Sequence, residues 1–99
     1  MGMERTTYEY NADKNIQLLE TRGVGFEDVI AILNTKGALA VIDHPNKSKY
    51  PHQKIYVVDI NNYAYMIPFV HDGDVVTLKT IFPSRKMSRL THRLAKLAQ

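Results

Sequence analysis

The strongest constraint on the fold is a series of β-prone segments after Gly37, joined first by a polar loop at 44–51 with a proline near each end and then by two very short connections. Four strands are predicted there: 38–43, 54–60, 63–70 and 75–82. Asn61-Asn62 suits a two-residue hairpin because Asn tolerates positive φ, and 71–74 is predicted to be a turn. Connections this short favour antiparallel neighbours, so a meander is expected. Pro68 lies inside a predicted strand, where its missing N–H would break the ladder, and we interpret it as a bulge or bend.

Helical patterns flank this block of strands. A short strand at 7–10 precedes a helix that Asn11 caps and Gly23 ends, and a second helix covers about 26–36. A final helix is predicted from about Ser84 to Leu97. The order β-α-α-β-β-β-β-α predicts a single α+β domain over residues 1–99, with its helices on one face of the sheet.

The charge is divided unevenly along the chain. The last 21 residues, from Lys79 to Gln99, hold six Lys or Arg and no Asp or Glu. The other 78 residues hold seven basic and ten acidic side chains. The net charge of +3 is therefore the sum of about −3 on these residues and about +6 on the last 21. Positive charge concentrated in one segment is typical of a contact with RNA, DNA or an acidic protein.

Composition excludes several kinds of chemistry. The chain has no Cys, which rules out disulfides, thiolate metal sites and a thiol nucleophile. Asp43 and His44 are adjacent, but two residues do not make a metal site, so we expect neither metal nor cofactor. The polar start, residues 1–10, lacks the apolar stretch of a signal peptide, and no run approaches the roughly 20 apolar residues of a membrane span. We therefore expect a cytoplasmic protein without membrane contact.

The predicted final helix is amphipathic, with a wholly cationic polar side. Arg85, Arg89 and Arg93 recur every four residues and form one stripe, which Lys86 flanks. One interpretation is a helix packed by its apolar face with solvated charges outside. The other is a platform for phosphates, and it is favoured because no acidic residue alternates with the stripe to neutralise it.

Three segments in order resemble the BrnT-like toxins of bacterial type II toxin–antitoxin systems. They are the start Tyr10–Asn15, the joint Arg22-Gly23-Val24-Gly25-Phe26-Glu27-Asp28, and the strand-to-helix stretch Leu78–Arg89. The resemblance spans roughly Tyr8 to Leu94. In the loop 49–54 the chain lacks the acidic and basic pair that this family usually has there, and Ser84 replaces an Ala.

The resemblance implies a RelE-like fold and an endoribonuclease acting on RNA, either at the ribosome or free. It also implies a cognate antitoxin, often with a ribbon-helix-helix DNA-binding part, that neutralises the toxin. DNA would then be contacted only indirectly, through the complex with that antitoxin.

RNA cleavage without a metal needs a base, an acid and a group that stabilises the phosphorane. Arg85 is our candidate for the charge, because its guanidinium matches two phosphate oxygens. Lys79 is a second cation, expected on the strand face away from the core. His52 is the acid–base candidate, because imidazole ordinarily titrates near neutral pH, and His71 and His92 are alternatives.

Several residues are predicted to hold RNA rather than to react with it. Tyr56 and Tyr65 could stack on bases, although strand aromatics more often cover a core. The other candidates are cations and one histidine of the final helix: Lys86, Arg89, His92 and Arg93.

Three classes of function remain open from the sequence. The first is a toxin-type endoribonuclease of the BrnT/RelE-like kind. The second is a non-catalytic module of the same fold that binds nucleic acid or the antitoxin, which the missing pair in the 49–54 loop favours. The third is an interaction module whose basic helix docks on an acidic protein.

Overall fold

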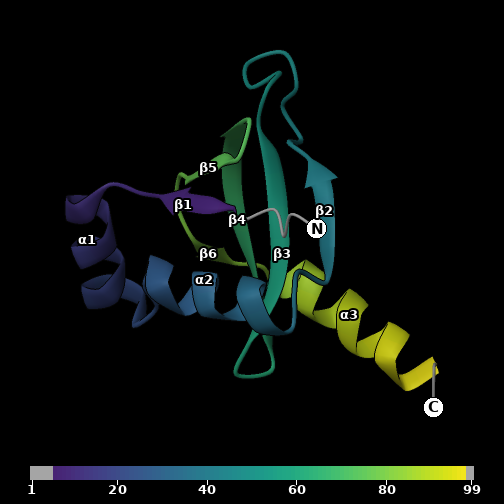
Figure 1. The fold of residues 1–99 in the computed structure, drawn as a ribbon. Helices are drawn as coiled ribbons and strands as arrows, with labels where there is room; N and C mark the ends of the chain where they lie inside the picture. Colours follow the sequence, from purple (N-terminus) through teal and green to yellow (C-terminus); the bar gives the residue numbers. More distant parts are fainter. Residues whose placement is uncertain (1–5, 98–99) are drawn as a thin grey trace, which may run out of the picture.

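The computed structural model describes residues 6–97, with side chains up to residue 93 (Figure 1). Residues 1–5, part of the polar start considered above, lie outside this range. In chain order the elements are β1 (Thr7–Glu9), α1 (Ala12–Arg22), α2 (Phe26–Thr35), β2 (Ala40–Asp43), β3 (Lys54–Ile60), β4 (Tyr63–Asp72), β5 (Val75–Leu78), β6 (Phe82–Pro83) and α3 (Arg85–Leu97). The α+β class is confirmed.

The strands form one sheet in the order β1-β5-β4-β3-β2, with β6 also paired to β4. The predicted antiparallel meander is confirmed for β2 to β5. However, β1 joins the β5 edge in the parallel direction, so the sheet as a whole is mixed. This parallel pairing is possible because both helices α1 and α2 lie between β1 and the meander in the sequence.

The sequence predicted the tight turn between β3 and β4 correctly, but the turn between β4 and β5 only in part. Asn61 and Asn62 have φ of 53° and 66°, which confirms the two-residue hairpin between β3 and β4. The predicted turn at 71–74 is wrong in its first half, because His71 and Asp72 belong to β4 and pair with β5. Only the following Gly and Asp connect the strands, and Gly73 has φ of 59°.

The single strand predicted at 75–82 is divided into β5 and β6. The β4–β5 ladder ends at the pair Phe69 and Leu78, and the β4–β6 ladder resumes at the pair Met66 and Phe82. Three residues on the β5–β6 side therefore face two on β4. One extra residue on one side of an antiparallel pair is a β-bulge.

Pro68 lies on β4 opposite this bulge. The backbone N–H of Lys79 donates to the Pro68 carbonyl at 2.8 Å. In an antiparallel strand the N–H and C=O of one residue point to the same side, so the N–H that Pro68 lacks would also point at the bulge. The predicted irregularity at Pro68 is therefore present, but its extra residue is on the β5–β6 side rather than in the strand of Pro68, whose ladder to β3 stays continuous.

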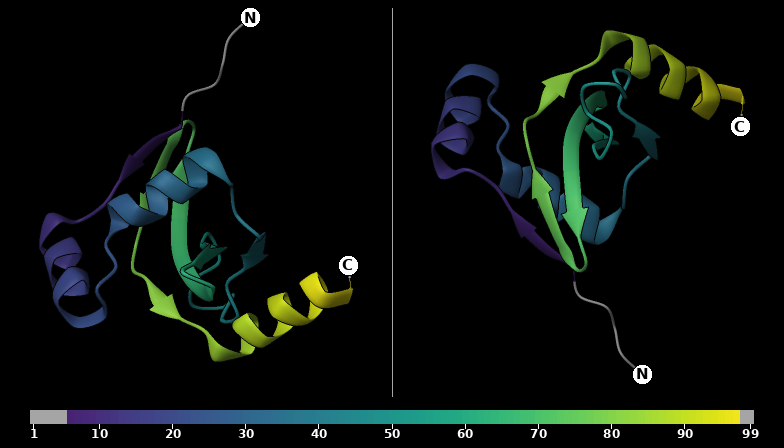
Figure 2. Two further views of the ribbon diagram at one scale, coloured as in Figure 1. Left: turned by 90° about the horizontal axis from the view of Figure 1, so that it is seen from below. Right: turned by 90° about the horizontal axis from the view of Figure 1, so that it is seen from above.

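Both faces of the sheet are covered, so the prediction of helices on one face is wrong. Val57 and Val58 are successive residues of β3 and both are fully buried, which requires cover on each side. One face carries the main apolar cluster, where Phe26 and Val29 of α2 meet Val58. Figure 2 shows α2 and α3 on opposite sides of the sheet. Val57 points away from Val58 and its cluster, and so lies on the α3 side.

The start of α3 is fixed to the backbone of β4. The N–H of Ser84 donates to the carbonyl of Ala64 at 2.9 Å, and the N–H of Ala64 donates to Ser88 Oγ at 2.7 Å. Ser84 Oγ also accepts from the N–H of Met87 at 3.2 Å, which caps the helix. These bonds determine where the basic helix leaves the sheet.

Within residues 6–97 we find no helix with both the length and the apolar character to cross a membrane.

Ser88→Ala should lower the free energy of unfolding by about 1–3 kcal/mol, because it leaves the buried N–H of Ala64 without an acceptor. Urea unfolding followed by circular dichroism measures this loss. The exposed Ser48→Ala is the matched control and should change stability by less than about 0.5 kcal/mol. Equal stability of the two variants would contradict the anchoring role of Ser88.

Candidate nucleic-acid interface

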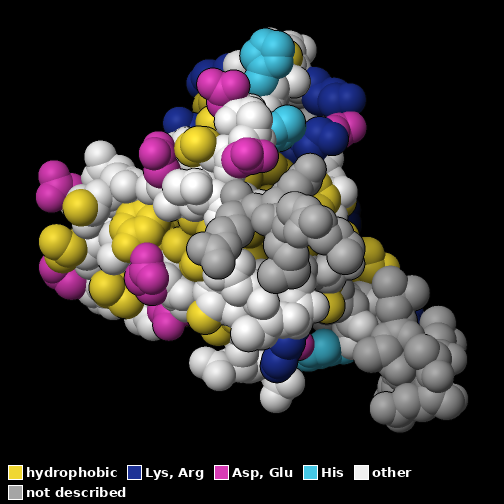
Figure 3. Space-filling view, viewed as in Figure 1, with side chains coloured by type: hydrophobic (Ala, Val, Ile, Leu, Met, Phe, Trp, Pro, Cys, Tyr) yellow, Lys and Arg dark blue, Asp and Glu magenta, His cyan; other side chains and the backbone are white. Residues whose placement is uncertain are grey.

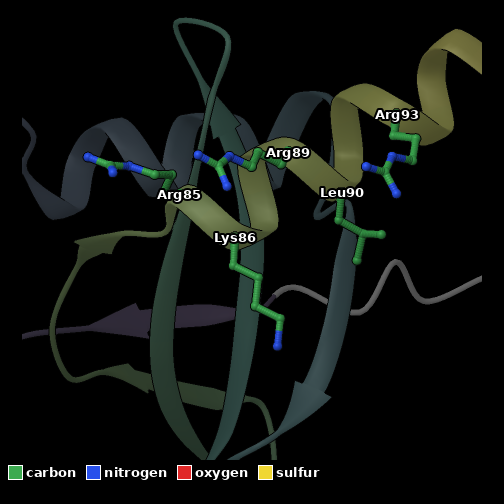
Figure 4. Close-up of a pocket in the computed structure, with 5 residues that line it drawn as sticks. All are labelled: Arg85, Lys86, Arg89, Leu90 and Arg93. Atoms are coloured by element: carbon green, nitrogen blue, oxygen red, sulfur yellow. The ribbon is translucent and has the colours of Figure 1, made fainter.

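A groove on α3 is lined by four cations and one leucine. The lining residues are Arg85, Lys86, Arg89, Leu90 and Arg93, and the groove has a volume of about 460 Å³ (Figure 4). All four cationic side chains are exposed, and Leu90 is 44% exposed. In Figure 4 Arg85 and Arg89 extend to one side of the helix, while Lys86 and Leu90 extend to another.

The spacing of the sequence produces this groove directly. Residues four apart lie on the same side of an α-helix, about 6 Å apart along its axis, so Arg85, Arg89 and Arg93 form a row. Among the described residues the one ion pair within 4.0 Å joins Lys47 to Asp43. The groove cations therefore have no carboxylate partner there, and their charge remains available to an anion.

The other predicted residues of the basic segment lie outside the groove. His92 is exposed on α3 but does not line it. Lys79 is exposed in the bulge between β5 and β6, and its backbone rather than its side chain has a defined contact, with Pro68.

His52 lies in a second hollow at the other end of the molecule. This hollow has a volume of about 330 Å³ and its lining residues are Asp43, Pro51, His52, Gln53, Lys54 and His71. The β2–β3 loop contributes Pro51, His52 and Gln53 to this hollow. The loop projects beyond the sheet at the top of Figure 1, far from α3. The three proposed catalytic residues, His52, Lys79 and Arg85, are therefore not assembled in one site.

The carboxylate of the second hollow is already paired. Lys47 Nζ lies 3.0 Å from Asp43 Oδ2. The hydrogen bond and charge of Lys47, followed by the charge of Lys54, lower the pKa of Asp43. Asp43 is thus held as an anion with its own counterion, which suits it poorly to proton transfer.

The β2–β3 loop is ordered by local contacts. The N–H of Asn46 donates to His44 Nδ1 at 3.0 Å, and the N–H of Tyr50 donates to the carbonyl of Asn46 at 2.9 Å. The rings of His44 and Tyr50 are 4.5 Å apart, and Lys49 Nζ lies 5.4 Å from the Tyr50 ring centre. His52 follows directly on this compact turn.

The two predicted base-stacking tyrosines pack against the protein. Tyr56 stacks on Phe69 with ring centres 3.9 Å apart and planes 12° apart, and burial, followed by the charge of Tyr8, raises the pKa of Tyr56. Tyr65 meets Tyr63 edge-on at 5.9 Å. Tyr56 and Tyr65 are partly buried beside the α2-side cluster, so the structure places them on the face away from α3.

Sequence reasoning missed Lys54 as a site residue and treated His71 mainly as part of a turn. Lys54 is paired with Asp43 across the β2–β3 ladder, and His71 lies near the end of β4. The register of the strands brings Lys54 and His71 together, and predicting it would have located them.

The residues described contain no group of three His, Cys, Asp or Glu side chains placed to hold a metal.

Comparisons of the chain with protein-family models, with curated proteins and with solved structures find no match.

Lys47→Ala should raise the pKa of Asp43 toward its ordinary value, because it removes the hydrogen bond and the nearest positive charge. A pH titration of the side-chain carboxyl carbons by NMR measures the change. Lys49→Ala, two residues along the loop, is the matched control and should leave the pKa of Asp43 where it is in the wild type. An unchanged titration in Lys47→Ala would show that the ion pair does not form in solution.

Proposed function

We propose that this protein is the toxin of a bacterial type II toxin–antitoxin system and a metal-independent endoribonuclease. The observation that carries the proposal is the α3 groove, a row of exposed cations without carboxylate partners among the described residues. The resemblance of the strand-to-helix stretch Leu78–Arg89 to BrnT-like toxins supports the same function, because it covers the start of this row.

Phosphates of an RNA strand are the ligands that fit the groove best. Each guanidinium offers a planar set of donors that matches two phosphate oxygens, and three of them follow one another along α3. In the proposal, Arg85, Arg89 and Lys86 neutralise phosphates of the bound strand, and Arg93 extends the contact. The row offers cations for phosphates and no groups that read bases, so it would bind RNA through the sugar–phosphate backbone.

The proposal includes a cytoplasmic location and a cognate antitoxin. The partner would carry acidic side chains for the α3 row and an apolar side chain for the exposed Leu90. Contact with DNA would come through a ribbon-helix-helix part of that partner and not through this chain.

A non-catalytic nucleic-acid-binding module of the same fold is the second candidate. It is favoured by the separation of His52 from Arg85, because the groove on α3 contains no side chain that ordinarily titrates near neutral pH. Such a module would bind RNA with a strong dependence on salt and would leave the RNA intact.

Arg85→Ala should abolish growth arrest when the protein is expressed in bacteria, and should lower RNA cleavage in vitro about 10- to 100-fold at limiting RNA, mainly by raising KM. The reason is the loss of one phosphate-neutralising guanidinium from an exposed position, which leaves the fold intact. The measurements are growth after induction, total RNA, and cleavage of a labelled RNA in the presence of EDTA.

Arg22→Ala is the matched control for this experiment. It removes the same charge from an exposed position at the end of α1, on the opposite side of the molecule from α3 (Figure 1). It should retain wild-type activity. Full activity of Arg85→Ala would refute the placement of the RNA on α3, and an inactive wild type that binds RNA would favour the second candidate.

Arg89→Ala should reduce the salt dependence of RNA binding. Each phosphate neutralised on a single strand contributes about 0.7 to the slope of log K against log salt concentration, so the slope should become shallower by about that amount. Fluorescence anisotropy of a labelled RNA at several salt concentrations measures it. An unaltered slope would indicate that Arg89 does not contact phosphate.

A further inference from the structure

The α3 groove provides charge but no proton transfer. Its polar lining is entirely Arg and Lys, which stay protonated at neutral pH in ordinary surroundings. Cleavage without a metal requires a group that accepts a proton and another that donates one. In the described residues, the hollow beyond the sheet is where two histidines, His52 and His71, come together with a lysine, Lys54.

Strand register explains why these residues share one hollow. Lys54 pairs with Phe69 across the β3–β4 ladder, so the two side chains are on the same face of the sheet. His71 is two residues further along β4 and is on that face as well. His52 approaches from the β2–β3 loop, and its side chain is exposed, as are those of Lys54 and His71.

We propose that His52 and His71 are the general base and general acid of RNA cleavage, with Lys54 binding the scissile phosphate. This inference rests on the proposed function and deepens it by locating the chemistry away from α3. The three side chains supply the base, the acid and the positive charge that the reaction requires.

The reaction balances without any further reactant. One imidazole takes the proton of the ribose 2′-OH as that oxygen bonds to phosphorus. The other, protonated imidazole gives its proton to the 5′-oxygen as the P–O5′ bond breaks. The products are a 2′,3′-cyclic phosphate and a 5′-hydroxyl, and the two histidines end with their protonation states exchanged.

The surroundings of the hollow favour an anionic ligand. Asp43 of β2 is held by Lys47 at 3.0 Å, which limits its competition for Lys54. Lys49 adds a further cation on the loop, and Asp72, next to His71, faces the other side of β4. Figure 3 shows histidines and basic side chains gathered around this end of the molecule, with acidic ones among them.

The two sites then have separate tasks on one RNA strand. Ala64, which anchors α3, and His71 are seven residues apart along β4, a path of roughly 23 Å. Lys54 and His71 share the face of Phe69, away from α3, so an RNA strand that reaches both sites must pass around an edge of the sheet. Contacts on α3 would mainly affect KM, and the histidines would mainly affect kcat.

The test compares His52→Gln and His71→Gln with the wild type, using a labelled RNA in EDTA over a range of pH. We expect kcat to fall at least 100-fold in each variant with KM nearly unchanged, and each to lose one limb of a bell-shaped pH profile. A 2′,3′-cyclic phosphate end in the wild-type product is also expected. Thermal unfolding should confirm that both variants, altered at exposed positions, retain the fold.

Ser48→Ala is the control, because it alters an exposed residue of the same loop that does not line the hollow. It should cleave at the wild-type rate. An equal fall in Ser48→Ala, or normal pH profiles in the two histidine variants, would overturn the assignment while the proposed function stood. A wild type that never cleaves RNA would instead reject the proposed function itself.

Discussion

The backbone of β4 is the element on which the rest of the structure depends. It pairs with β3 along one side and with both β5 and β6 along the other. Near its start, Ala64 exchanges hydrogen bonds with Ser84 and Ser88 and so fixes where α3 begins. In its middle, Pro68 has no N–H to offer, and the bulge that accommodates this loss directs the chain from β5 to β6. At its far end it carries His71 into the second hollow.

This arrangement separates the positive and negative parts of the molecule. The chain passes from β6 into α3 on the face away from α2, so the cationic row lies apart from the acidic first turns of α1 and α2. Figure 3 shows acidic side chains over the α1 side of the molecule. The net charge of +3 would give only weak attraction if it were spread evenly, whereas a separated charge attracts a polyanion to one surface.

Local features of the fold could be predicted from the sequence, and long-range ones could not. The caps at Asn11 and Gly23, the Asn61-Asn62 hairpin and the bulge opposite Pro68 each follow from the conformational limits of a few residues. The parallel pairing of β1 depends on where β5 lies in space, which no local pattern specifies. The two covered faces were foreseeable in principle, because Val57-Val58 places successive apolar residues on opposite sides of β3.

The two candidate sites also differ in whether local sequence could locate them. The row on α3 follows from a spacing of four within one helix, so sequence alone located it. The second hollow brings together β2, the β2–β3 loop, β3 and β4, and its membership depends on register. His71 was predicted in a turn because Gly73 follows closely, yet pairing with Val76 keeps it in the strand. A shift of register by one residue would turn Lys54 to the other face and away from His71, so the proposed chemistry depends on strand pairing and the RNA contact on a single helix.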